Sequence, residues 1–386
     1  MKHRLKNFGL LVIDYIKITD NFLILMSVGA SILSCFLIAS LYPESISTLK
    51  PVYIQMGASF AGLVLAIFVS HFDYHQIANL WKIIGISALV LSLLVFTPLG
   101  TLRGGNDMSG PGSGSEDLNW LNLGFVTLQP SEFLKVAFVI TFSYHCYKVS
   151  NRINEPSMLF LLFAHALIPI GIIYLQNDYG TMSVFVFIFI CILFIAGINW
   201  KVILGGIGVG VFIVMLILTN TIPSYLLQRI KILEDLDSAK RGLGLQQYTG
   251  RITLATGKMF GKGFHSNDLL TNTPELYNDM VFSHVGQIVG FVGCACVLLW
   301  VVLYCLRLLQ NGIKAQDELG YFLCVGCFAV IFFQSVINIG MVLCLLPIIG
   351  VTLPFISAGG SSVISTYLLL GLAISVHNHT YKATLF

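Results

Sequence analysis

The sequence is poor in charge. Only 10% of its 386 residues are Asp, Glu, Lys or Arg, whereas 56% are hydrophobic, and the mean hydropathy is +0.86. A typical soluble domain has about 25% charged residues, so this composition excludes an ordinary soluble domain and predicts a chain that lies largely in lipid. The small net charge of +3 also argues against nucleic acid as a partner.

A disulfide framework is also missing from the pattern. The nine cysteines are scattered through apolar segments, whereas a disulfide framework places them in loops. Cys324 and Cys327 have the spacing of a metal motif, but they lie inside an apolar run without a second ligand pair. We therefore interpret them as small core residues and not as a zinc site.

Long apolar runs are abundant. A spanning helix needs about 20 mostly apolar residues, and about ten runs meet that length. These predicted spans cover residues 22–42, 52–70, 79–98, 129–147, 158–176, 179–198, 201–220, 281–306, 320–343 and 352–376. The sequence thus predicts an all-α polytopic membrane protein, with residues 1–386 forming a single membrane domain.

Basic residues predict the orientation of these spans. Residues 1–20 form a basic lead without a signal-peptide cleavage site, and Lys and Arg recur in alternate loops. Since cytoplasmic segments carry the excess of Lys and Arg, both termini are expected in the cytoplasm. Residues 99–128 and 221–280 then form two long extracellular loops, the second between helices seven and eight. Within it, Tyr225–Leu236 is expected to form a surface helix. Polar residues are concentrated in these loops, so we expect any chemistry at the outer face.

The fourth predicted span begins with two opposite charges. Glu132 and Lys135 follow Pro130, which suits a first helical turn. Their spacing places both on one helix face. Charges at membrane depth are usually paired and functional, and two interpretations stay open: a structural ion pair, or part of an ion-lined cavity.

Another carboxylate, Asp178, directly precedes the sixth predicted span, 179–198. Asp178 is expected to cap the sixth helix, although it could also be a second carboxylate in the cavity of Glu132. His145, His165 and His284 are isolated in apolar sequence, which favours satisfied buried residues over metal ligands.

Asp279 is a carboxylate that lies directly before a long apolar run. It is either an anchor at the water line or part of a reaction. The loop before it mixes glycines with Lys258 and Lys262, which suits a phosphate-bearing lipid or a solvated loop equally well. After it, prolines and paired glycines in 347–362 predict a broken helix that packs closely and lines a cavity.

Together these motifs resemble the SEDS proteins (shape, elongation, division and sporulation), the RodA/FtsW-type peptidoglycan polymerases. The likeness covers nearly the whole chain. It is carried, in order, by Trp120-Leu121-x-Leu-Gly124, Gln129-Pro130-Ser131-Glu132-x-x-Lys135, Gln176-x-Asp178-x-Gly180-Thr181, Gln228-Arg229-Ile230, Gly261-Lys262-Gly263-Phe264, Pro274-Glu275…Asp279-x-x-Phe282, Asn338-Ile339-Gly340-Met341 and Leu353-Pro354-Phe355-Ile356-Ser357-x-Gly359-Gly360-Ser361.

The resemblance implies a peptidoglycan glycosyltransferase in the bacterial cytoplasmic (inner) membrane. Its substrate would be lipid II, the undecaprenyl-pyrophosphate-linked disaccharide peptide, polymerised at the outer leaflet. Asp279 would be the catalytic carboxylate acting as general base, and a cationic group or a divalent ion such as Mg²⁺ or Mn²⁺ would stabilise the departing pyrophosphate. The supporting cavity would contain Glu132, Lys135, Trp120 and Asp178. The candidate substrate-binding residues are Gln129, Ser131, Arg229, Lys258, Lys262, Ser357, Gly359 and Gly360.

The family also implies partners: a class B penicillin-binding protein and the elongation or division machinery, with the short termini favouring elongation. The chain departs from the family pattern at Asn177, Gln287 and Ala358, which bears on activity more than on fold. Two other hypotheses remain: a lipid II flippase, or a non-catalytic scaffold that activates a penicillin-binding protein.

Overall fold

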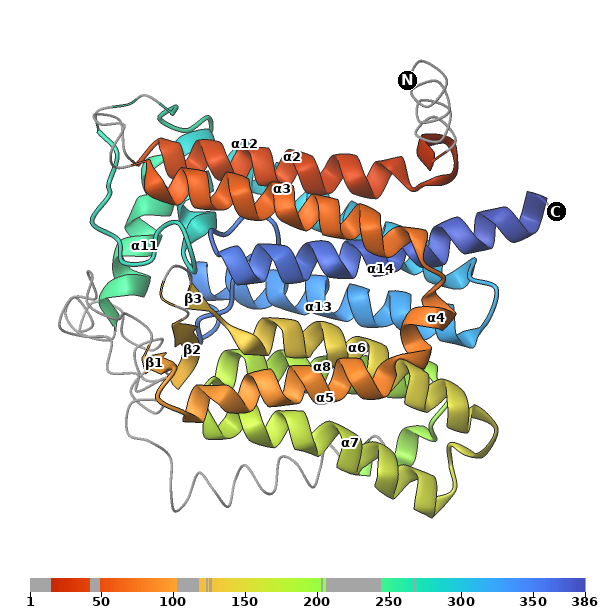
Figure 1. The fold of residues 1–386 in the computed structure, drawn as a ribbon. Helices are drawn as coiled ribbons and strands as arrows, with labels where there is room; N and C mark the ends of the chain where they lie inside the picture. The colour runs from red at the N-terminus through yellow and green to blue at the C-terminus, as the bar shows by residue number, and fades with distance from the viewer. Residues whose placement is uncertain are drawn as a thin grey trace.

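The computed structural model describes residues 15–41, 49–102, 118–122, 124, 127–202, 204–205, 244–264, 266 and 268–385. Within these residues, six helices are long and apolar enough to cross a membrane. They are α2 (Asn21–Ala39), α3 (Lys50–His71), α7 (Pro156–Leu175), α12 (Val281–Ile313), α13 (Glu318–Val342) and α14 (Gly360–Leu385). α5 (Trp81–Leu93), α6 (Pro130–Val149) and α8 (Tyr179–Ile195) lie among them in the same bundle (Figure 1).

Nine of the ten predicted spans correspond to these nine helices. The seventh, 201–220, falls almost entirely outside the described residues, as does the predicted surface helix Tyr225–Leu236. The tenth begins at Gly360 and not at residue 352, because the preceding segment is irregular and Phe355 has a φ of 62°. Side chains of α3 and α13 bind backbone groups of this irregular segment.

The bundle has two distinct ends (Figure 1). α6, α8, α12 and α14 all begin at one end, which we call the site end. The first described residues and the end of α14 lie at the opposite end, which agrees with the prediction that both termini lie on one side. The short helix α4 (Tyr74–Asn79) joins α3 to α5 there.

The long loops contain regular structure that the sequence did not predict. A small antiparallel sheet of order β1-β2-β3 lies at the site end, formed by β1 (Gly100–Leu102), β2 (Leu118–Asn122) and β3 (Thr127–Leu128). α11 (Leu245–Thr256) lies in the second loop, beside the start of α12. The protein is therefore helical apart from this one sheet in the described part of the chain.

α12 is longer than a membrane span and is interrupted. Its 33 residues would extend about 50 Å at ~1.5 Å per residue, whereas the hydrocarbon core is about 30 Å thick. Gly290 leaves the helical conformation, with φ 76° and ψ −165°. The break separates a short first part, Val281–Val289, from a membrane-length second part.

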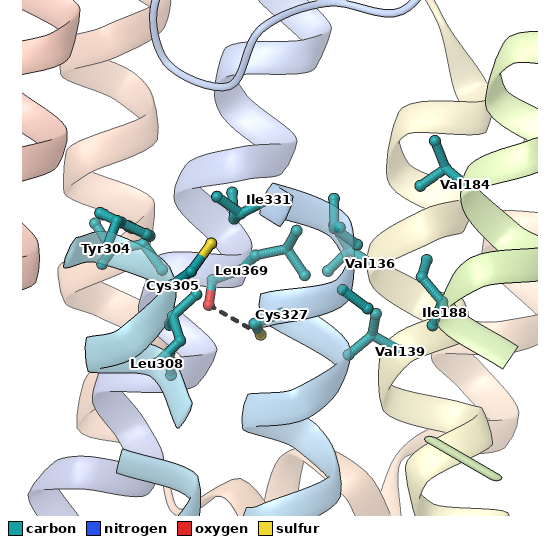
Figure 2. Packing of buried hydrophobic residues seen from close by; sticks show 14 of the residues in the cluster. Val136, Val139, Val184, Ile188, Tyr304, Cys305, Leu308, Cys327, Ile331 and Leu369 are labelled. Atoms are coloured by element: carbon teal, nitrogen blue, oxygen red, sulfur yellow. Dashed lines mark hydrogen bonds between the residues drawn. The ribbon is translucent and has the colours of Figure 1, made fainter. Parts of the chain in front are cut away.

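The core lies where α6, α8, α12, α13 and α14 meet. Figure 2 shows Val136 and Val139 of α6 near Ile188 of α8. On the other side of α13, Cys327 donates a weak hydrogen bond to the backbone oxygen of Leu369 at 3.5 Å. Cys324 and Cys327 are both buried, as expected of packing residues.

Candidate functional site

Asp279 lies in the turn directly before α12, at the site end, and is 2% exposed. The turn is closed by the backbone oxygen of Glu275, which accepts from the amides of Asn278 at 3.1 Å and Met280 at 3.0 Å. Glu275 has a φ of 53°, so the chain reverses sharply here. An anchor at the water line would keep its charge exposed to water, because burying a charge is costly. The buried Asp279 carboxylate does not fit that interpretation.

The segment 351–358 holds this turn from the other side. Asn338 of α13 donates from Nδ2 to the backbone oxygens of Asp279 and Val351, both at 2.8 Å. The Ser357 hydroxyl donates to the backbone oxygen of Asn278 at 2.6 Å and accepts from the amide of Leu353 at 2.8 Å. The Ala358 amide adds a bond to the Tyr277 oxygen at 2.8 Å. The position of Asp279 is therefore fixed by side chains far away in sequence.

Gln55 of α3 extends this support, and the sequence analysis missed it. Its side chain is buried in the second turn of the apolar helix α3. Its Nε2 donates to Ser34 Oγ at 2.9 Å and, more weakly, to the Ser357 oxygen at 3.4 Å. Its Oε1 accepts from the Gly359 amide at 3.3 Å. A buried amide in an apolar run was the available signal.

Glu132 and Lys135 form an ion pair. Lys135 Nζ lies 2.9 Å from Glu132 Oε1, and both side chains are buried. The Ser365 hydroxyl of α14 donates to Glu132 Oε2 at 2.7 Å. Both oxygens of the carboxylate thus have partners, and the pair attaches α6 to α14.

Asp178 caps α8, as predicted. Its Oδ1 accepts from the Thr181 amide at 2.9 Å. Its Oδ2 accepts from Gln129 Nε2 at 3.2 Å and Asn119 Nδ2 at 3.4 Å. Asn119 precedes Trp120, which is half-buried in β2 and pairs with Thr101 of β1. Asp178 therefore connects the sheet to the starts of α6 and α8.

The first turns of α14 connect these groups. Ser361 Oγ accepts from the Gln129 amide at 3.1 Å, and the hydroxyls of Ser362 and Thr352 lie 2.9 Å apart. Since Ser365 binds Glu132, the stretch 351–365 contacts the Asp279 turn, the ion pair and the Asp178 cluster. Gly359 and Gly360 lie within it, and Ser131 is buried at the start of α6.

Two of the three basic substrate-binding candidates, Lys258 and Lys262, follow directly after α11. Lys258 is exposed, and Lys262 donates from Nζ to the backbone oxygen of Asp268 at 2.6 Å. Arg229 lies outside the described residues. No contact between Lys258 or Lys262 and Asp279 is observed in the part of the chain that the structure describes, so their role in substrate binding stays a prediction.

The isolated histidines have polar partners. His284 is buried, with Nε2 3.0 Å from the Leu37 oxygen and 2.9 Å from Ser40 Oγ. Its Nδ1 lies 3.3 Å from the carboxamide of Gln287. His145 and His165 share a bond between their Nδ1 atoms at 3.0 Å, so one ring donates and the other accepts. The interpretation as satisfied residues is confirmed.

The carboxylates of the site bear on whether it could hold a metal ion. Within the described ranges, no group of three or more His, Cys, Asp and Glu side chains could hold one. A divalent ion usually needs only one or two carboxylates when a substrate phosphate supplies the other ligands. Asp279 with a bound pyrophosphate is compatible with that arrangement.

The chain is similar in sequence to known proteins. The FtsW/RodA/SpoVE family model, described as cell cycle protein, matches residues 19–382. A probable peptidoglycan glycosyltransferase FtsW of Trichlorobacter lovleyi is 29% identical over 326 residues, covering 83% of this chain and 82% of that protein. The peptidoglycan glycosyltransferase MrdB of Escherichia coli K12 is 30% identical over 268 residues, covering 67% and 70%.

The fold is also similar to a solved structure. A chain from a study of polymerization and crosslinking by a peptidoglycan synthase complex superposes with a TM-score of 0.77 at 25% identity. The match covers 94% of this chain and 99% of that one. The predicted fold class, a polytopic helical membrane protein, is thereby confirmed.

Proposed function

The chain belongs to the FtsW/RodA/SpoVE family of cell cycle proteins, and we propose that it polymerises lipid II into glycan strands at the outer leaflet, with Asp279 as the catalytic carboxylate. The observation that carries this proposal is the construction around Asp279. A buried carboxylate is held by Asn338, Ser357 and Ala358 through its own turn. Such rigid placement is what general-base catalysis requires.

The reaction assigns a defined task to this carboxylate. A sugar hydroxyl of one lipid-linked unit attacks the anomeric carbon of another, whose bond to the pyrophosphate oxygen breaks. Asp279 takes the proton from the attacking hydroxyl as the new glycosidic C–O bond forms, and the lipid pyrophosphate departs with the electron pair. General-base assistance of this kind contributes about 10²–10⁴-fold to a rate.

The Glu132–Lys135 pair has a supporting role in this scheme. Because Lys135 is already paired with Glu132 at 2.9 Å, its charge is neutralised within the helix bundle. Through Ser365, the pair fixes α14, whose preceding segment holds the Asp279 turn. Stabilisation of the pyrophosphate then falls to other cations, and Lys258, Lys262 and Arg229 are the candidates, alone or with a divalent ion.

The partner proposed from the same family is a class B penicillin-binding protein, which would crosslink the strands that this chain polymerises. What supports it is the similarity to a chain from a peptidoglycan synthase complex. The protein is a multi-pass membrane protein, and we place it in the bacterial cytoplasmic membrane with the site end outward. This orientation follows from the basic residues in the lead and the alternate loops.

The test is polymerisation of lipid II by purified protein, followed by gel analysis of the glycan products. Asp279→Asn keeps the size of the side chain but removes the base, so we expect a loss of at least about 10²-fold in rate. Glu155→Gln is the matched control, because the Glu155 side chain is exposed and makes no capping hydrogen bond at the start of α7, at the opposite end of the bundle. It should retain activity, and both variants should keep the parent's unfolding temperature.

Polymer from the Asp279→Asn variant at the parent's rate would refute the catalytic assignment. Transport of labelled lipid II across sealed vesicles, unchanged in that variant, would favour the flippase hypothesis. A parent protein that forms no polymer alone or with its penicillin-binding partner, yet activates that partner, would favour the scaffold.

A further inference from the structure

The segment after α11 runs beside α12 toward the membrane. Gly250 of α11 lies against Met280 and Ser283, at the start of α12. Gly257, just after α11, lies against the backbone of Gly286 and Gln287, one to two turns further along α12. The two helices therefore run in the same direction, and residues 257–263 lie beside the break at Gly290.

Backbone hydrogen bonds attach these residues, which we call the 257–263 turn, to the break. The amides of Phe291 and Val292 donate to the oxygens of Lys258 and Met259 at 2.9 and 3.2 Å. In return, the amides of Lys262 and Gly263 donate to the oxygens of Gln287 and Ile288 at 2.9 and 3.0 Å. The backbone groups that the break removes from the helix ladder are thus paired, as a membrane environment requires.

The length of α12 sets the height of this turn in the bilayer. Its second part, Phe291–Ile313, has close to the ~20 residues that a spanning helix requires. If Ile313 marks the inner boundary of the hydrocarbon core, then Phe291 lies at the outer boundary. The 257–263 turn, bonded to Phe291 and Val292, lies at that same height.

The side chains at this height form one apolar surface. Phe260 is 81% exposed and Met259 is 55% exposed, beside Phe291 at 63% and Val292 at 42%. The ammonium group of Lys258 is exposed next to them. Apolar side chains with a flanking cation are the pattern of a segment that lies in a membrane interface.

We propose that the 257–263 turn is a membrane-interface anchor. Met259 and Phe260 insert into the outer leaflet at the hydrocarbon boundary, and Lys258 contacts the phosphates of anionic phospholipid headgroups. The inference does not rest on the proposed function, and it gives Lys258 a phospholipid phosphate as its partner in place of the donor pyrophosphate. It fixes the height of the break in α12, and hence the height of the helix start that carries Asp279.

The apolar part is tested with Phe260→Trp in bilayers that contain lipids brominated on the acyl chain. The four native tryptophans are subtracted by using the parent protein as baseline. The added emission should be quenched by the brominated lipid and shielded from acrylamide in water. Thr127→Trp, at an exposed position of β3, is the control and should show the reverse. Added emission from Trp at 260 that behaves like the control would overturn the proposal.

The cationic part is tested by counting the phosphatidylglycerol and phosphatidylcholine molecules that stay bound in native mass spectrometry. Lys258→Gln should lower the preference for phosphatidylglycerol about 5-fold, the factor that corresponds to ~1 kcal/mol for one interfacial Lys. Lys258→Arg, which keeps the positive charge, is the matched control and should leave the preference unchanged. An unchanged preference in Lys258→Gln, an equal loss in Lys258→Arg, or displacement of the lipid by inorganic phosphate would each contradict the anchor.

Discussion

Single polar side chains connect the elements that surround Asp279. Gln55, Asn338 and Ser365 each lie on a different helix, and each bonds a segment that is distant in sequence. In a membrane, such groups have no water to replace a lost partner, so their bonds are demanding in geometry. Activity should therefore depend on residues that do not touch the substrate.

Gln55→Leu should lower the polymerisation rate without removing the base. The substitution leaves the Gly359 amide without its acceptor, at a cost of about 1–3 kcal/mol for a buried group. It also loosens the segment whose Ser357 holds the Asp279 turn. The lipid II assay and thermal unfolding in detergent measure the two effects, and Gln310→Leu, exposed near the end of α12, is the control. Full activity with a lowered unfolding temperature would limit Gln55 to stability.

Removing one charge of the Glu132–Lys135 pair should destabilise the protein more than removing both charges. Glu132→Gln leaves Lys135 charged and buried, and removal of one partner of a buried pair costs about 3–5 kcal/mol. The double variant Glu132→Gln/Lys135→Met removes both charges and should be more stable than Glu132→Gln alone. Thermal unfolding and expression yield measure this order. A double variant that is stable but inactive would show that the charges serve the reaction as well as the fold.

At the scale of helices and strands, the apolar runs predicted most of the fold. Nine predicted spans correspond to helices, since about 20 apolar residues have few alternatives to a spanning helix. The start of α14, the β sheet and α11 were not predicted. The start of α14, for example, depends on a bond between distant segments, from the Gly359 amide to Gln55, and such bonds leave no periodic pattern.

The residues of the candidate site also divide into those that the sequence predicted and those that it did not. Asp279, Asp178 and the Glu132–Lys135 pair were visible because charge is rare in this chain and each lies at a helix start. Gln55 and Ser365 were missed because one amide or hydroxyl in an apolar run also fits simple packing. Their partners lie more than 200 residues away, beyond what spacing can predict.

The break in α12 leads to a prediction for glycine. Gly290→Ala should destabilise the protein, because Gly290 has a φ of 76° and a Cβ there would collide with the backbone of Met259 and Gly261. The strain at such a backbone conformation is of order 1–3 kcal/mol, before the collision is counted. Gly171→Ala in α7 is the control, since nothing lies near its Cβ position, and it should be neutral or stabilising. Thermal unfolding distinguishes them, and equal midpoints would mean that the break is not required.

For the molecule as a whole, the two ends serve different purposes. The chain belongs to the FtsW/RodA/SpoVE family, and its proposed catalytic carboxylate lies at the site end. If Phe291 lies at the hydrocarbon boundary, the first part of α12, Val281–Val289, lies outside the hydrocarbon core, with Asp279 at its start. The anomeric carbon of a lipid-linked donor is bonded directly to the pyrophosphate, so the proposed reaction takes place close to the headgroup phosphates.

The opposite end carries an ionisable connection between α4 and the α12–α13 turn. His75 Nδ1 lies 3.0 Å from Asp73 Oδ1, and its Nε2 lies 2.8 Å from Asp317 Oδ2. Tyr74 also donates to Asp317 at 2.9 Å, and the His379 ring lies 6.3 Å from the Tyr74 ring. Partial burial lowers the pKa of His75, but the hydrogen bonds to Asp73 and Asp317 outweigh it, so the pKa is raised above its usual value.

The stability of the whole protein should therefore depend on pH through this residue. A group whose pKa is raised on folding contributes fully below its unfolded value, about 6.5 for His, and the contribution is lost as pH rises through the folded value. The thermal midpoint of the parent should fall as pH rises above 6.5, and His75→Gln should remove that part of the slope. The pKa of Asp73 is lowered, so its contribution is lost only in acid, below this window. His71→Gln, on the neighbouring turn of α3, should keep the parent's slope; the same slope in His75→Gln would show that the bridge does not set the pH dependence.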